Sequence, residues 1–223
     1  MSNSKIVIAK DLYLGYDNTI VLERSSFYLE RGEFVFLTGA SGEGKTTIIR
    51  HLYGELKPKS GYLNIGGFDM NKISGSKLTT LRRHIGVVFQ DYKLIKEWTI
   101  DKNVKLPLMI AGVSEEIQNR EASKLLSKVK LAHIADKYPY ELSGGEQQRA
   151  AIIRALIHQP VMILADEPTG NLDDYSSKLV MDLFKFANKL GITVLIATHQ
   201  LPVDFDVRYR HFHIEGKKLH EVS

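Results

Sequence analysis

A glycine-rich stretch at residues 39–47 combines the residue types that bind phosphate groups. Its three glycines allow backbone conformations in which successive N–H groups point at phosphate oxygens. Lys45 supplies a positive charge for the outer phosphates, and the Thr46 hydroxyl is suited to Mg²⁺. A plain glycine-rich turn is the alternative, but the fixed offsets of these residue types favour a phosphate-binding loop. We expect the following residues to hold the phosphates: Gly39, Ala40, Ser41, Gly42, Glu43, Gly44, Lys45, Thr46 and Thr47.

Two adjacent carboxylates, Asp166 and Glu167, follow an apolar run at residues 161–165. Carboxylates at the end of a buried strand are unfavourable unless they meet a cation or take part in proton transfer. With a phosphate loop in the same chain, we expect Asp166 to bind Mg²⁺. Glu167 is then placed to act as general base toward an attacking water. A surface turn with two acids is the alternative, and the entirely apolar run before them disfavours it.

Two more polar residues follow apolar runs: Gln90 comes after residues 85–89, and His199 after residues 192–197 and Thr198. A strand-end amide is suited to bind a metal or a water, although chance alone would often put one there. His199 is suited to contact the terminal phosphate or the attacking water, or it is an ordinary strand-end residue. Because open α/β sheets bind ligands beyond the carboxyl ends of their strands, these residues and the two carboxylates predict one shared rim.

A second anion site is predicted where a helix begins after residue 142. Glycines weaken a helix, so Gly144 and Gly145 at a helix start call for an explanation. Together with Ser143, their free backbone amides at the helix N-terminus would bind an anion. A serine cap with a glycine turn is the alternative, which the following Glu-Gln-Gln-Arg disfavours. Tyr16, assigned to a turn at residues 15–18, would either stack on a base or be partly buried surface.

The elements that position these residues follow from hydrophobic periodicity. Residues 6–14 and 21–29 predict antiparallel strands, because their apolar residues follow a period of about two. Later apolar runs predict buried strands, with helices between them, and the final residues predict an edge hairpin turning at 215–217. The predicted buried strands lie at residues 33–38, 85–89, 161–165 and 192–197, and residues 61–67 predict a strand between turns.

Residues 91–159 differ in character, because helical spacing dominates there. Pro107 is expected to kink or end the first helix of this region. Apolar residues near Trp98 form either the core of this region or a groove for a partner. We expect one domain over residues 1–223, in which residues 1–90 and 160–223 form the core and residues 91–159 form an inserted α-helical lobe.

Composition excludes several classes of protein. The chain has no cysteine, so disulfides, thiolate zinc sites and cysteine nucleophiles are excluded. The first residues lack the apolar core of a signal peptide, and no apolar run approaches the roughly 20 residues that span a bilayer. Net charge is +4, but the basic residues are dispersed among 26 acids without a basic stripe. We therefore expect no nucleic-acid partner.

Taken in order, these motifs resemble those of the ATP-binding cassette (ABC) ATPases across essentially the whole chain. Residues 39–46 resemble the Walker A loop, residues 142–148 the family signature and residues 161–167 the Walker B strand. The resemblance implies an α/β P-loop NTPase core with an N-terminal antiparallel β portion and an inserted α-helical lobe. It implies that Tyr16 is the aromatic that stacks on adenine and that Gln90 is the Q-loop glutamine. It also implies that Glu167 is the catalytic glutamate and His199 the switch histidine.

The same resemblance implies ATP and Mg²⁺ as the bound groups and hydrolysis of ATP to ADP and phosphate as the reaction. It implies a head-to-tail homodimer on ATP binding, in which the signature of one subunit closes over the ATP of the other. Gln90 would join Thr46 and Asp166 at the metal. Gln200 departs from the family pattern, which usually carries an acid after the switch histidine.

Within this family the chain is most similar to the ATPases of bacterial cell division, on stretches such as residues 164–173 and 193–199. That similarity implies an integral membrane partner of FtsX type, a peripheral position on the cytoplasmic side of the inner membrane, and a role in peptidoglycan remodelling. The partner's cytoplasmic helix is expected in a groove beside Gln90, near Tyr92, Leu94 and Trp98. The ATPase subunit of a lipoprotein-release or efflux transporter is the alternative. A soluble nucleic-acid-associated ATPase is disfavoured by a single cassette without a basic stripe.

Overall fold

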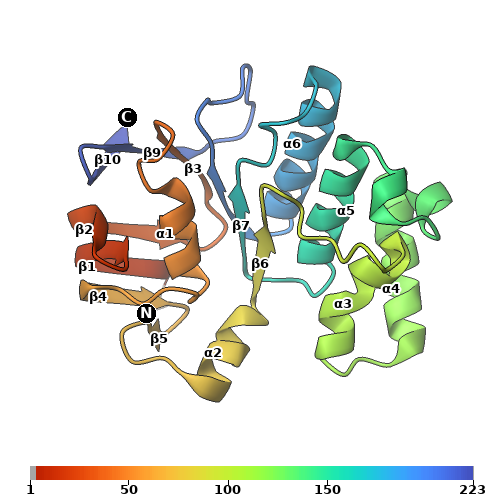
Figure 1. The fold of residues 1–223 in the computed structure, drawn as a ribbon, viewed down its shortest axis with the longest axis horizontal. Helices are drawn as coiled ribbons and strands as arrows, with labels where there is room; N and C mark the ends of the chain where they lie inside the picture. Colours follow the sequence, from red (N-terminus) through yellow and green to blue (C-terminus); the bar gives the residue numbers. More distant parts are fainter. Residues whose placement is uncertain (1–3, 223) are drawn as a thin grey trace.

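Two β-sheets organise the chain in the computed structural model, which describes residues 4–222 (Figure 1). Residues 1–3 and residue 223 lie outside the described part. The prediction that the first residues are not a signal peptide falls partly on these residues. One sheet has six strands in the order β10-β9-β3-β8-β7-β6, and the other has four in the order β2-β1-β4-β5. The mixed α/β architecture predicted from the sequence is confirmed.

The six-stranded sheet is parallel apart from its last strand, which pairs antiparallel at one edge. Every residue of β3, β7 and β8 is buried, as expected for strands covered on both faces. This explains why the sequence shows them as continuous apolar runs. The strands are β3 (Phe34–Gly39), β6 (Ile85–Val88), β7 (Met162–Asp166), β8 (Thr193–Ala197), β9 (Arg210–Glu215) and β10 (Lys218–Val222).

The second sheet contains β1 (Lys5–Tyr16), β2 (Thr19–Glu30), β4 (Ser60–Ile65) and β5 (Phe68–Asp69), all paired antiparallel. The predicted turn at residues 15–18 is wrong in extent, because Gly15 and Tyr16 belong to β1. Tyr16 pairs with Thr19, so only two residues connect the strands. A Cβ on Gly15 would lie 2.0 Å from the Thr19 carbonyl oxygen, so this glycine permits close strand pairing rather than a turn.

Six α-helices cover the sheets within the described residues. Figure 1 shows α3, α4 and α5 gathered on the side of the molecule away from β1, β2 and β4. Pro107 was predicted to kink or end its helix. It does not end the helix, because α3 continues to Ile110. The turn after Pro107 closes normally, with the Ala111 N–H donating to the Pro107 carbonyl at 3.1 Å. The helices are α1 (Lys45–Leu52), α2 (Gly75–Arg82), α3 (Ile100–Ile110), α4 (Glu115–Lys128), α5 (Gly144–Leu156) and α6 (Asp174–Lys189).

The core lies on both faces of the six-stranded sheet. Successive residues of a strand point to opposite faces, so Phe34 and Phe36 belong to one buried cluster and Val35 and Leu37 to the other. The first cluster includes residues of α3, α4, α5 and α6, and the second includes residues of α1 and the four-stranded sheet. The strands are thereby fixed from both sides, which makes their ends a rigid support.

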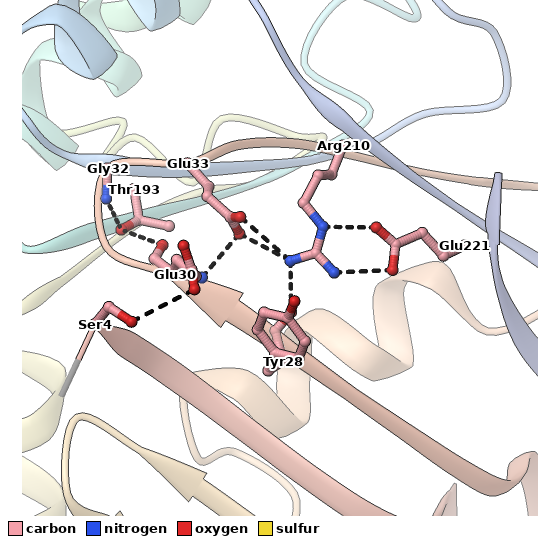
Figure 2. A network of polar contacts seen from close by, with 8 residues as sticks. All are labelled: Ser4, Tyr28, Glu30, Gly32, Glu33, Thr193, Arg210 and Glu221. Carbon is pink, nitrogen blue, oxygen red and sulfur yellow. Dashed lines mark hydrogen bonds and ion pairs between the residues drawn. The ribbon is translucent and has the colours of Figure 1, made fainter. Parts of the chain in front are cut away.

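A polar network around Arg210 ties the two sheets together (Figure 2). The Arg210 guanidinium, on β9, pairs with Glu221 of β10 at 2.7 Å and with Glu33 at 3.1 Å. It also donates to the backbone carbonyl of Tyr28 on β2 at 3.0 Å. The hydrogen bond to Glu221 is the largest of several contacts that raise the pKa of Arg210 above its usual range. One side chain thus joins three strands from the two sheets.

None of the helices within residues 4–222 combines the length and the apolar character that crossing a membrane requires.

Candidate active site

A cavity of about 390 Å³ lies at the edge of the six-stranded sheet where its parallel strands end. The phosphate loop follows β3, Glu167 follows β7, and Gln90 and His199 come two residues after β6 and β8. The shared rim predicted from the polar strand ends is therefore present in the fold. Of the residues that the sequence singles out, the cavity is lined by Tyr16, Ser41, Gly42, Gly44, Lys45, Thr46, Thr47, Gln90, Glu167 and His199.

Two glycines of the phosphate loop are required by its shape. Gly42 has φ 86° and Gly44 has φ 102°, values that side chains other than hydrogen rarely allow. At Gly44 a Cβ would also come 2.8 Å from the Cβ of Val21 on β2. Because Gly44 caps the N-terminus of α1, the loop passes directly into a helix whose first residues, Lys45 to Thr47, line the cavity. The first N–H groups of a helix have no partner within the helix, which suits this position to an anion.

Lys45 is buried and holds the phosphate loop from within. Its Nζ donates to the carbonyl oxygens of Gly39 at 2.7 Å and Ala40 at 3.2 Å. The same atom lies 3.4 Å from Oε1 of Glu167. Gly39 and Ala40 therefore contact the lysine rather than line the cavity. Glu43 does not line the cavity either, and its Cβ would lie 3.6 Å from a Cβ on Gly39.

Asp166 is the last residue of β7, and its side chain is buried beneath the phosphate loop. Burial raises the pKa of Asp166, and the neighbouring Glu167 adds to this, whereas the Thr46 hydroxyl and Lys45 oppose it. Its Oδ1 atom has no hydrogen-bond partner among the described residues. A buried carboxylate oxygen without a partner, next to a threonine hydroxyl, is suited to a hard cation.

The residues present fit Mg²⁺ bound together with a nucleotide. Within residues 4–222, no group of three or more His, Cys, Asp or Glu side chains is arranged to hold a metal. Mg²⁺ usually takes only one or two protein carboxylates and completes its shell with phosphate oxygens and water. Asp166, the Thr46 hydroxyl and the Gln90 amide are the groups that would contribute ligands here.

Glu167 connects the phosphate loop to the end of β8. Its Oε2 lies 3.0 Å from Nδ1 of His199 and accepts the His199 backbone N–H at 3.3 Å. An ionised carboxylate only accepts hydrogen bonds, so Nδ1 carries the proton in this contact. Glu167 itself has φ 44°, an unfavourable backbone conformation for a residue with a side chain. Strain of this kind persists where surrounding contacts fix a functional group.

Ser143, Gly144 and Gly145 lie outside this cavity. Ser143 caps α5 in a reciprocal pair with Glu146: Glu146 Oε2 accepts the Ser143 N–H at 2.9 Å, and Ser143 Oγ accepts the Glu146 N–H at 3.3 Å. The Ser143 hydroxyl is the main cause of the lowered pKa of Glu146. Within one chain, then, the two predicted anion sites are not brought together.

Packing is a second reason for glycine at positions 144 and 145, and the sequence does not reveal it. A Cβ on Gly145 would come 2.7 Å from Oγ of Ser176, at the start of α6, and a Cβ on Gly144 would come 3.1 Å from Oη of Tyr92. Both positions are crowded by residues distant in sequence. The helix start therefore depends on glycine for packing, whatever it binds.

Comparison with known proteins identifies the family of this chain. The family described as ABC transporter matches residues 22–170, well over half of the chain. The chain belongs to the ABC transporter family. It is an ATP hydrolase of that family, and the resemblance found in its motifs is confirmed.

Relatives of this ABC ATPase align over nearly its whole length. The cell division ATP-binding protein FtsE of Escherichia coli (strain K12) is 41% identical over 199 residues, which are 89% of this chain and 90% of the relative. FtsE of Streptococcus pneumoniae serotype 2 (strain D39 / NCTC 7466) is 40% identical over 215 residues, covering 96% and 94%. The dimeric structure of a post-hydrolysis state of the ATP-binding cassette MJ0796 bound to ADP and Pi has a TM-score of 0.87 at 33% identity, covering 97% of each chain.

Three residues of the ABC ATPase cavity were not among the predicted site residues: Val21, Gly170 and Asn171. Gly170 and Asn171 follow the carboxylate pair closely in sequence, which was an available signal. Val21 carries no such signal, because its role is to pack against Gly44 across the fold. The roles of the site residues in binding and catalysis stay predictions.

A second cavity, of about 720 Å³, lies on the other side of the loop that carries Gln90. A partner groove was expected near Tyr92, Leu94 and Trp98, and that expectation stays a prediction; none of the three lines this cavity, although their neighbours Phe89 and Lys93 do. Tyr92 faces Gly144, Leu94 packs against the core, and Trp98 lies under the Lys102 ammonium group. Apolar residues form about half of the lining: Tyr53, Ile85, Val87, Phe89, Leu106, Pro107, Ile110, Ala111 and Ala155.

Proposed function

We propose that this ABC ATPase dimerises on ATP and drives a membrane partner of FtsX type in bacterial cell division, with peptidoglycan remodelling as the outcome. The observation that carries the enzymatic part is the contact of Glu167 with both Lys45 and His199 at the phosphate loop. The division role is supported by relatives named FtsE that are 40–41% identical over at least 89% of the chain. Its position would be peripheral, on the cytoplasmic side of the inner membrane.

In the proposed mechanism, the backbone N–H groups around Gly42 and Gly44 bind the phosphates of ATP. Lys45 exchanges its contacts with the loop carbonyls for contacts with the outer phosphates. Tyr16, which is 42% exposed at the cavity, stacks on the adenine. Mg²⁺, held by Thr46, Asp166 and Gln90, would neutralise charge on the phosphates. These groups come from the ends of β-strands, the loops that follow them and the start of α1, so the fold already places them around one cavity.

The chemical step that we assign to Glu167 is proton removal from the attacking water. Its carboxylate is held on one side by the His199 ring and backbone N–H, and on the other by Lys45. These contacts orient the carboxylate toward the cavity, where it would accept the proton of the attacking water. His199 is the residue placed to sense the terminal phosphate, because it contacts the base and lines the cavity.

A second copy of the chain is the proposed source of the missing half of each site. Ser143, Gly144 and Gly145 lie outside the cavity of their own chain, and Ser143 is exposed at the start of α5. A head-to-tail dimer would bring the N-terminus of α5 from one subunit over ATP held by the other. The related cassette MJ0796 has been solved as a dimer with ADP and Pi.

The partner would bind in the apolar cavity of about 720 Å³ beside the Gln90 loop. Its lining of aromatic, leucine, isoleucine and proline side chains is suited to the apolar face of a short helix. This position would let the partner reach Gln90 from the side opposite to the nucleotide. No nucleic-acid partner is proposed.

A transporter ATPase, for lipoprotein release or efflux, is the second candidate. It is favoured by the similarity to MJ0796, which is described as a bacterial ABC transporter cassette, at 33% identity over 96% of each chain. The catalytic residues would be the same in both cases. Only the partner distinguishes them.

The test is affinity purification of a tagged Glu167→Gln variant from gently solubilised membranes with ATP and Mg²⁺, followed by mass spectrometry. A Lys45→Ala variant, which should not bind ATP, serves as control. Recovery of a small polytopic membrane protein with an extracytoplasmic loop supports the division role. Recovery of transporter subunits favours the second candidate, and recovery of RNA or ribosomal proteins alone contradicts both.

A further inference from the structure

Arg154 is a buried cation near the end of α5 that forms no ion pair within the described residues. Only 9% of its surface is exposed. Its guanidinium donates to the backbone carbonyls of Lys93 at 2.6 Å and Tyr92 at 2.7 Å. Burial lowers the pKa of Arg154 to about 10. A buried charge without a counter-ion is unfavourable, so the position of Arg154 calls for an explanation, and its two hydrogen bonds show where to look for one.

The two carbonyls belong to residues with an unusual backbone. Tyr92 has φ 61° and Lys93 has φ 48°, and consecutive left-handed residues other than glycine are unfavourable. The loop is tight, because the Tyr92 N–H donates to Phe89 at 3.1 Å and the Lys93 N–H to Asp91 at 2.6 Å. Arg154 therefore binds the chain at two consecutive residues that are both in the left-handed region.

This loop separates the two cavities. Gln90 lines the nucleotide cavity, whereas Phe89 and Lys93 line the apolar cavity together with Arg154. Only a few residues lie between the proposed metal ligand and the lining of the proposed partner site. The conformation of the loop thus determines where Gln90 lies.

The loop also contacts the start of α5. Tyr92 Oη occupies the space beside Gly144, where a Cβ would come within 3.1 Å. Arg154 makes its contact near the other end of the same 13-residue helix. Gly144 and Arg154 are ten residues apart on α5, which is about 15 Å along the helix axis at about 1.5 Å per residue, and the long Arg154 side chain reaches back to the loop. Two separated contacts resist rotation of the loop against the helix, which a single contact would not.

We propose that Arg154 is a positioning residue which, together with Tyr92, fastens the Gln90 loop to α5. Gln90 and the signature residues at the start of α5 then move as one unit. This inference deepens the proposed function and rests on it for the role of Gln90 in catalysis. The contact between the loop and α5 does not depend on that role.

The experiment compares the wild-type protein with Arg154→Met, Arg154→Lys and the exposed control Arg120→Met. Hydrogen exchange of the full-length, nucleotide-free protein is measured at residues 90–94, and kcat and KM for ATP are measured in parallel. For Arg154→Met we expect exchange at residues 90–94 to rise about tenfold, with exchange in α1 unchanged. We expect kcat to fall about tenfold and KM to stay within about twofold, because the phosphate loop is untouched. Arg154→Lys should give intermediate values, since lysine replaces only part of the two-armed contact.

Unchanged exchange at residues 90–94 in Arg154→Met would overturn the proposal. A rise spread evenly over all segments, with a matching loss of thermal stability, would overturn it too, because Arg154 would then be a general structural residue. The exchange measurement needs neither ATP turnover nor a partner. If the tagged Glu167→Gln variant recovers no membrane partner, the proposed function fails, while the exchange result at residues 90–94 still decides the proposal about Arg154 by itself.

Discussion

Nδ1 of His199 lies 3.0 Å from Oε2 of Glu167, while the other carboxylate oxygen lies 3.4 Å from Nζ of Lys45. The three residues come from the ends of β8 and β7 and from the phosphate loop. The carboxylate is therefore oriented from two sides before any nucleotide arrives. This arrangement predicts that the base, its orienting histidine and the phosphate-binding lysine act as one unit, so that loss of any one removes most of the turnover.

Replacing Glu167 by Gln should lower kcat by about 100-fold or more, because the amide keeps the shape of the side chain but does not accept the proton. ATP binding should remain within a few-fold, since Lys45 and the glycines are unchanged. Phosphate release and calorimetric binding of ATP measure the two quantities. The exposed Glu116→Gln variant is the matched control and should retain full turnover. A Glu167→Gln protein with wild-type turnover would show that another group is the base.

Asp166 predicts a dependence of stability on pH. Its pKa is raised in the folded protein, so the folded state holds the proton more tightly than the unfolded state. Stability from this group is therefore present at acid pH and is lost as the pH rises through the folded pKa. Asp166→Asn, which is neutral throughout, should raise the stability of the nucleotide-free protein at pH 7.

Thermal unfolding at several pH values tests this prediction. The advantage of Asp166→Asn should shrink as the pH falls toward the acid range, where wild-type Asp166 gains its proton. With ATP and Mg²⁺ the order should reverse, because binding stabilises the wild-type protein more. A variant that is less stable than wild type at pH 7 without nucleotide would contradict the assignment of Asp166 as a strained, cation-binding carboxylate.

The Arg210 network should contribute measurably to stability. Arg210→Met removes charge-assisted hydrogen bonds to Glu221 and Glu33 and leaves both acids without that partner. We expect a loss of about 1–3 kcal/mol in the free energy of unfolding, measured by urea denaturation. Arg210→Lys should recover only part of it, because lysine lacks the planar two-sided donor set. Lys72→Met is the control, because the Lys72 side chain is 86% exposed. A similar loss of stability in Lys72→Met would contradict a specific role of the Arg210 network.

Much of the fold could be predicted because buried parallel strands appear in the sequence as uninterrupted apolar runs, as in β7 and β8. The phosphate loop and the polar residues that follow those runs predicted most of the cavity lining, since the carboxyl ends of parallel strands meet at one edge. What could not be predicted depends on contacts between distant segments. Val21 against Gly44, Ser176 against Gly145 and Arg154 against the Gln90 loop leave no local pattern. Pro107 misled because one missing N–H does not outweigh the packing of α3.

The crowding at Gly145 gives the most specific prediction about packing. Alanine normally stabilises a helix by about 1 kcal/mol relative to glycine. In Gly145→Ala, however, the new methyl group would lie 2.7 Å from Oγ and 2.9 Å from Cβ of Ser176, so α5 or the start of α6 must shift. We expect a net loss of about 1–3 kcal/mol in the nucleotide-free protein, which is the usual result of overpacking.

A double-mutant cycle isolates this contact. Ser176→Gly removes the side chain that the methyl group meets, so Gly145→Ala should be less harmful in that background than in the wild-type protein. Gly144→Ala is the comparison, because its nearest neighbour is the far end of the Tyr92 side chain at 3.1 Å, which moves more easily. Urea denaturation of the four proteins of the cycle gives the coupling energy. If Gly145→Ala costs the same with and without Ser176, the glycine is not retained for packing, and binding at the α5 N-terminus remains the sole reason for it.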